Sequence, residues 1–128
     1  MRDFDLGSAE LEVLKVLWDE GPSNVRRVME ALHARERLVA YTTVQTMLTR
    51  LEQKGFVECD RAGAAYTYSA AITREQISRS RLRKLVEQLY DGAAGALVLQ
   101  LLRTERLAPG EIAELQKLIE SLDTKRRR

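Results

Sequence analysis

The sequence contains few of the residues that build cross-linked or reactive sites. Its 128 residues include one cysteine, one histidine, two prolines and only 5% aromatic residues. A single cysteine, Cys59, excludes an intrachain disulfide and a CxxC metal site, and it fits a reducing compartment. With one histidine and no glycine-rich phosphate loop, no pairing of a nucleophile with a base emerges. We therefore expect no enzyme, no metal site and no cofactor.

Long apolar runs are also missing. No stretch approaches the roughly 18 apolar residues that a membrane-spanning helix needs. The N-terminus, MRDFDLGSAE, carries acids where a secretory signal would need an apolar run. We expect a cytoplasmic protein without membrane insertion.

Charge is divided unevenly along the chain. Residues 1–70 carry nine Lys/Arg against eleven Asp/Glu, whereas residues 71–128 carry twelve against eight, and the whole chain has a net charge of +2. Affinity for nucleic acid comes largely from phosphate contacts. The acidic front half could therefore bind DNA only through a locally basic face.

Helical spacing of apolar residues marks three segments in the first half. Residues 9–20 form the first predicted helix, and Ser23 is expected to cap the second over residues 24–37. The third spans Thr42–Lys54, with a capping box at Thr42–Gln45 and Gly55 as its C-cap. LVAY at 38–41 is predicted as a short strand, and residues 56–61 and 66–70 as a hairpin.

From Thr73 onward the pattern predicts helices only. AAGALVLQLLR at 93–103 is apolar nearly all round, and such a helix must be surrounded. Residues 73–122 are too few to surround it, so we expect a second copy of the chain to do so. The predicted dimerisation residues are Leu82, Leu85, Val86, Leu89, Leu97, Leu99, Leu101, Ile112, Leu115 and Ile119. The predicted domains are thus 1–72 and 73–122, followed by a basic disordered tail at 123–128.

Three helices followed by a hairpin are typical of a winged helix-turn-helix head, giving a mainly helical fold with a small β wing and a C-terminal helical dimerisation region. Thr, Gln and Arg side chains suit the reading of base edges, whereas Glu would repel phosphate. Candidate base or backbone contacts are Thr43, Thr46, Thr49, Arg50 and Gln53; candidate phosphate contacts are Arg26, Arg27, Lys54 and Arg61. Winged domains also bind proteins, so a protein–protein adaptor is the alternative.

Three stretches resemble the BlaI/MecI (penicillinase repressor) family of bacterial transcriptional repressors. They are LGSAELEVLKVLWDEGPSNVRRVMEAL, AYTTVQTMLTRLEQKGFVE and the paired tyrosines of YTYSA, within a likeness covering about residues 6–122. The resemblance implies a homodimer that represses transcription by occupying a dyad-symmetric operator in double-stranded DNA.

The resemblance also implies release by proteolysis in the dimerisation region, after a membrane sensor detects a signal. The best-known members are cut at an Asn-Phe bond, and the matching bond here is Gln100–Leu101. Release by direct binding of a small ligand is the alternative mechanism.

Overall fold

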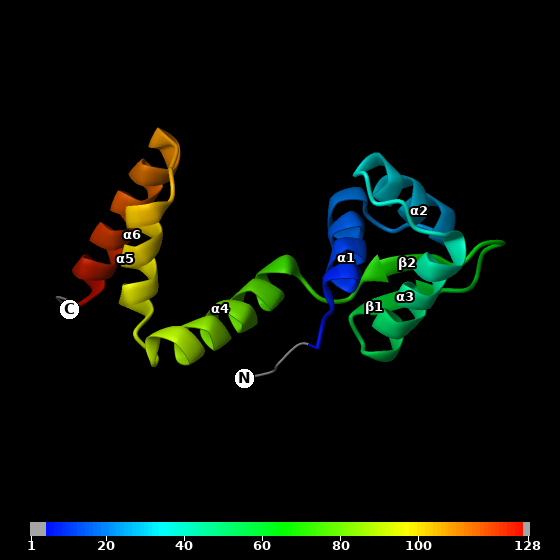
Figure 1. Ribbon diagram of the computed structural model, residues 1–128, viewed down its shortest axis with the longest axis horizontal. Helices are drawn as coiled ribbons and strands as arrows, with labels where there is room; N and C mark the ends of the chain where they lie inside the picture. The colour runs from blue at the N-terminus through cyan, green and yellow to red at the C-terminus, as the bar shows by residue number, and fades with distance from the viewer. Residues whose placement is uncertain (1–4, 127–128) are drawn as a thin grey trace. The chain divides into compact units, whose positions relative to one another are not determined.

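Six helices and one two-stranded sheet make up residues 5–126, the part of the chain that the computed structural model describes. In order they are α1 (Ser8–Glu20), α2 (Val25–Ala34), α3 (Tyr41–Gln53), β1 (Val57–Asp60), β2 (Thr67–Ala70), α4 (Arg74–Tyr90), α5 (Ala94–Thr104) and α6 (Pro109–Arg126) (Figure 1). The predicted class, mainly helical with a small β wing, is confirmed. The chain divides into two compact units, the first ending at Leu82 and the second beginning at Arg83.

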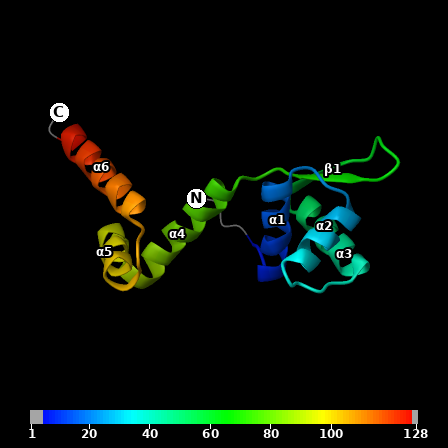
Figure 2. The ribbon, with the colours of Figure 1, turned by 90° about the horizontal axis from the view of Figure 1, so that it is seen from above.

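The first unit, which we call the head, is built on a core shared by α1, α2 and α3 (Figure 1, Figure 2). Residues three and four apart share one face of a helix, so each helix can turn an apolar stripe toward the other two. The buried members are Val13, Leu14, Val16, Leu17, Val25, Val28, Leu32, Val44, Met47, Leu48 and Leu51, joined by Phe56, Val57, Tyr68, Ile72 and Ile77 from the segments that follow. The polar side of each helix is consequently left on the surface of the head.

The ends of α2 and α3 differ in detail from those expected. Asn24, not Ser23, caps α2, because its side-chain oxygen accepts a hydrogen bond from the Arg27 N–H at 2.8 Å. The capping box predicted at Thr42–Gln45 is wrong, since α3 begins one residue earlier and its N-cap, Ala40, has no side-chain bond. Thr42 thus lies within the first helical turn.

Helix α3 ends one residue earlier than predicted, so Gly55 follows the C-cap and is not the C-cap itself. Lys54 is the C-cap and Gly55 follows it with φ of +81°, a conformation that costs glycine little. The N–H of Gly55 donates to the Glu52 carbonyl at 3.0 Å and the N–H of Phe56 to the Leu51 carbonyl at 2.9 Å. This pair of bonds is a Schellman motif, which satisfies the last carbonyls and turns the chain into β1.

The predicted hairpin is confirmed as the antiparallel pair β1–β2, in which Val57 faces Ala70 and Asp60 faces Thr67. Its turn projects beyond the three helices (Figure 1, Figure 2). Ser23 adds a short bridge, exchanging two backbone hydrogen bonds with Tyr68 at 2.9 and 2.8 Å. The short strand predicted at residues 38–41 is wrong, because residues 38–40 are irregular and Tyr41 begins α3.

The second unit contains the rest of α4 together with α5 and α6. Neither α5 nor α6 has a buried residue. Residues 123–126, predicted as part of a disordered tail, continue α6 instead, while residues 127 and 128 lie outside the described part of the chain. Among residues 5–126, no helix combines the length and the apolar character required to cross a membrane.

Candidate nucleic-acid interface

Helix α3 carries two contrasting faces. Its inner face buries Val44, Met47, Leu48 and Leu51 in the core of the head. Its outer face is formed by exposed residues, most of them polar: Tyr41, Thr42, Thr43, Gln45, Thr46, Thr49, Arg50 and Gln53. We call this set the α3 outer face. The core thus holds the helix rigidly while the α3 outer face remains open to a partner.

Five of the predicted DNA contacts, Thr43, Thr46, Thr49, Arg50 and Gln53, lie together on the α3 outer face. The predicted capping box places Thr42 and Gln45 at the start of the helix and outside the predicted interface. Both are exposed in the structure, because the earlier start of α3 makes them ordinary helical residues. Helical phase counted from the buried Val44 would have identified them.

Two of the threonine hydroxyls on this face, those of Thr46 and Thr49, are already engaged as donors. Thr46 Oγ1 donates to the Thr42 carbonyl and Thr49 Oγ1 to the Gln45 carbonyl, each at 2.9 Å. A hydroxyl has one hydrogen to donate and two lone pairs to accept. Each of these threonines can therefore offer a partner its methyl group or an acceptor oxygen, and the methyl is the group suited to a thymine methyl.

The predicted phosphate contacts fall into two groups. Arg26 and Arg27 are exposed in the first turn of α2, and neither guanidinium forms an ion pair with any described residue. Lys54 and Arg61, in contrast, are paired within the head. Lys54 Nζ lies 3.0 Å from a carboxylate oxygen of Glu10, and Arg61 forms an ion pair with Glu52 at 2.8 Å. Whether these four cations contact phosphate stays a prediction.

Lys54 and Glu10 join the end of α3 to the beginning of α1. Glu10 also accepts a hydrogen bond from the Gly7 N–H at 3.1 Å, and Lys54 donates a further bond to the Asp5 carbonyl at 2.8 Å. Burial raises the pKa of Glu10, but the bonds from Lys54 and Gly7 outweigh it and leave that pKa below its ordinary value. Glu10 is therefore held ionised, with Lys54 fixed beside it.

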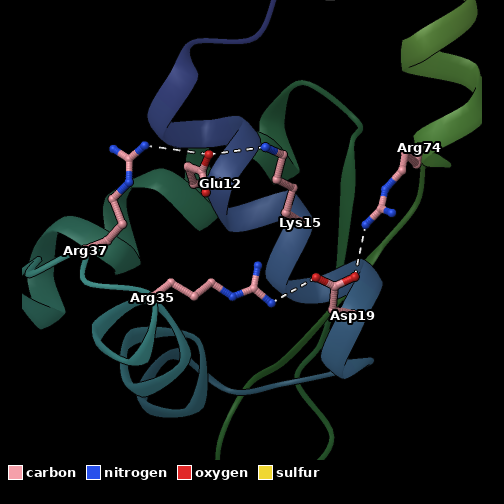
Figure 3. A network of polar contacts seen from close by, with 6 residues as sticks. All are labelled: Glu12, Lys15, Asp19, Arg35, Arg37 and Arg74. Carbon is pink, nitrogen blue, oxygen red and sulfur yellow. Dashed lines mark hydrogen bonds and ion pairs between the residues drawn. The ribbon is translucent and has the colours of Figure 1, made fainter. Parts of the chain in front are cut away.

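Ion pairs also hold the segment between α2 and α3 against α1 (Figure 3). Asp19 accepts hydrogen bonds from Arg35 and Arg74, both at 3.0 Å, and these bonds lower the pKa of its carboxyl. Glu12 pairs with Lys15 at 3.4 Å and with Arg37 at 3.7 Å. Single exposed pairs contribute little stability. Through Arg35 and Arg37, these pairs connect the segment between α2 and α3 to α1.

The predicted dimerisation residues are mostly uncovered in the single chain. Leu82, Leu89, Leu99, Leu101, Ile112 and Ile119 are 45–68% exposed, and Leu85, Leu97 and Leu115 are half-buried. Val86 differs, because only 5% of it is exposed and its own chain already covers it. The predicted cleavage bond, Gln100–Leu101, lies in the middle of α5 with both residues exposed. Its cleavage stays a prediction.

Three helices packed on a hairpin, with the third helix open to solvent, define a winged helix-turn-helix protein. Residues 6–121 match the family model described as penicillinase repressor. The chain is 30% identical to the penicillinase repressor of Bacillus licheniformis over 90% of this chain and 89% of that protein. It is 25% identical to the methicillin resistance regulatory protein MecI of Mammaliicoccus sciuri over 92% of this chain and 95% of that protein.

A solved structure agrees with these sequence relatives. The DNA-binding domain of the repressor BlaI is 32% identical and superposes with a TM-score of 0.50, covering 58% of this chain and 90% of that one. The chain therefore belongs to the penicillinase repressor family of DNA-binding transcriptional repressors. The relatives named here are regulators of transcription and not enzymes.

Proposed function

We propose that this repressor occupies a dyad-symmetric operator as a homodimer, with the α3 outer face of each head in a major groove. The observation that carries the proposal is the composition of that face: threonine, glutamine and arginine side chains are exposed on a helix that the core of the head holds from behind. Such side chains offer methyl groups, amides and a guanidinium to base edges. The B. licheniformis and BlaI relatives support the same function.

The second unit supplies the argument for two copies. Exposed large apolar side chains line α5 and α6 along their lengths: Val98, Leu99, Leu101, Leu102, Ile112, Leu118, Ile119 and Leu122, each between 43% and 58% exposed. Soluble monomers rarely expose contiguous apolar surface of this extent, and such surfaces mark interaction sites. A second copy presents the same residues and would cover them. Each Å² of apolar surface removed from water in this way would stabilise the dimer by about 25 cal/mol.

Dimerisation gives the repressor its affinity and its means of release. A dimer of winged heads is expected to place its two α3 helices about 34–36 Å apart, one turn of DNA. Binding of the first head raises the effective concentration of the second at its half-site, so each head alone binds more weakly than the pair. Anything that separates the second units, whether proteolysis or a ligand, would therefore relieve repression.

Titration of a labelled DNA fragment from upstream of the gene tests DNA binding by the full chain. Repeating it at several salt concentrations should show saturable binding whose affinity falls steeply as salt rises. A protein–protein adaptor would instead show no saturable binding at any salt concentration, and that result would reject the proposal.

Sedimentation of two full-length variants tests the dimer. Ile119→Glu places a charge on the apolar side of α6, and we expect it to yield monomers. Ala113→Glu adds the same charge to an exposed alanine one turn into α6, and it should remain dimeric. Dimers in both variants would place the interface elsewhere.

A further inference from the structure

A two-pronged ion pair joins the wing to the last turn of α3. Arg61 Nη1 donates to Glu52 Oε2 and Arg61 Nη2 to Glu52 Oε1, both at 2.8 Å. The guanidinium also lies over the ring of Tyr66, 5.1 Å from its centroid. Arg61 precedes the turn between β1 and β2, so this contact holds the base of the turn against α3. The hydrogen bonds from Arg61 lower the pKa of Glu52, so the carboxylate stays charged at neutral pH.

Glu52 is the only acidic residue of α3. Its side chain is 27% exposed, and Thr49 of the α3 outer face lies one turn before it on the same side of the helix. DNA that docks on this face would therefore bring phosphates close to Glu52 and Arg61. An unpaired carboxylate here would repel them, and an unpaired guanidinium would attract them.

The Glu52–Arg61 ion pair determines whether this site attracts or repels phosphate. Two-pronged guanidinium–carboxylate contacts are strong and geometrically specific, and the same fork of donors is the one that binds phosphate. Arg61 cannot present that fork to phosphate in the same way while Glu52 occupies it. If Arg61 released Glu52 to bind a phosphate, it would replace one anionic partner by another at little gain in free energy. Glu52 would then be left unpaired beside DNA.

We propose that Glu52 limits the affinity of this repressor for DNA by withholding Arg61 from phosphate. Phosphate contacts act on every sequence alike, so the restraint weakens operator and non-specific complexes together. The Glu52–Arg61 pair therefore lets the repressor dissociate from DNA more readily, while the residues that read bases are unchanged. The inference rests on the DNA-binding function proposed above, and it assigns Arg61 a role different from the phosphate contact expected from sequence.

The test compares four full-length variants with wild type: Glu52→Gln, Arg61→Gln, the double variant, and Glu58→Gln as control. Glu58 is exposed on β1 and forms no ion pair with another described residue, so its substitution removes the same charge from the wing without freeing a cation. Each protein is titrated with a fluorescent random-sequence duplex and with the upstream fragment over a range of salt concentrations. The readout is the slope of log K against log salt.

We expect Glu52→Gln to bind both duplexes severalfold more tightly and to steepen the slope by about 0.9 for each head in contact with DNA, the value for one added phosphate contact. Arg61→Gln introduced beside it should remove that gain. Glu58→Gln should keep the wild-type slope.

Three outcomes would overturn the inference while leaving DNA binding itself established. The first is a slope for Glu52→Gln no steeper than that of Glu58→Gln. The second is a slope for the double variant that is flatter than that of wild type, since Arg61 would then already contact phosphate. The third is a large fall in melting temperature with weaker binding in Glu52→Gln, which would make the pair a structural clamp. Failure of wild type to bind either duplex would reject the proposed function and this inference together.

Discussion

The indole Nε1 of Trp18 donates a hydrogen bond of 2.8 Å to the backbone carbonyl oxygen of Ile72. Trp18 lies near the end of α1, and Ile72 lies between the wing and α4. Ile72 is itself buried in the core of the head, and the guanidinium of Arg74 lies 5.3 Å from the centroid of the Trp18 ring. One side chain therefore fixes the path by which the chain leaves the wing and enters α4.

Replacing Trp18 by Phe should destabilise the head. The substitution keeps an aromatic ring but leaves the Ile72 carbonyl without its donor, and we expect a loss of about 1 kcal/mol in the free energy of unfolding. Trp18 is the only tryptophan, so urea unfolding should be followed by circular dichroism and not by fluorescence. An unchanged midpoint would show that the bond contributes no net stability.

Replacing Glu36 by Gly should stabilise the head. Glu36 follows the C-cap of α2 with φ of +63°, and its N–H donates to the His33 carbonyl at 3.0 Å while the N–H of Arg37 donates to Leu32 at 2.9 Å. These bonds form a Schellman motif at the position where glycine is favoured. Relief of the backbone strain, less the added freedom of the unfolded chain, should raise the unfolding free energy by roughly 0.5–1 kcal/mol.

Glu36→Ala is the matched control, because it removes the same side chain but keeps a Cβ atom. It should show no comparable gain in urea unfolding. Equal stabilisation by both substitutions would mean that the glutamate side chain, and not the backbone conformation, is unfavourable.

Thr46 permits a test of which group faces DNA. Because its hydroxyl hydrogen is donated to the Thr42 carbonyl, the methyl group is expected to make the contact. Thr46→Ser removes the methyl and should weaken operator binding by about 0.8 kcal/mol, or roughly fourfold. Thr46→Val keeps a methyl in its place and should bind more tightly than Thr46→Ser in the same titration. The reverse order would assign the contact to the hydroxyl oxygen.

Acid should destabilise the head through carboxylates whose pKa is lowered by folding. Glu10, Asp19 and Glu52 all have lowered pKa values in the folded chain. A lowered folded pKa gives stability that is fully present above the unfolded value, about 4 for these residues, and that is lost as pH falls through the folded value. Urea unfolding should therefore show stability held above about pH 5 and declining below about pH 4.

Glu10→Gln should reduce that decline, because glutamine does not titrate and Glu10 then contributes no proton uptake on unfolding. The variant should also be less stable than wild type at neutral pH, since Lys54 loses its partner. An unchanged pH profile would show that Lys54 does not stabilise the ionised form of Glu10.

Apolar periodicity specifies the elements of the head. The three helices of the head were predictable because their apolar residues recur at helical spacing, and the hairpin because aromatic and β-branched residues flank a glycine-containing turn. Five of the eight residues of the α3 outer face followed from the same periodicity. Errors came at helix ends and in LVAY, where local patterns were compatible with more than one structure.

The sequence by itself determined the helices, the wing and the polar character of α3, because periodic apolar residues decide which face of an element is buried. Only the tertiary structure decided how individual charges are used. Glu10 and Lys54 are 44 residues apart in the chain, and Arg35 and Arg74 meet the same Asp19. No local pattern specifies such pairs, because they depend on how the elements pack once the core has formed.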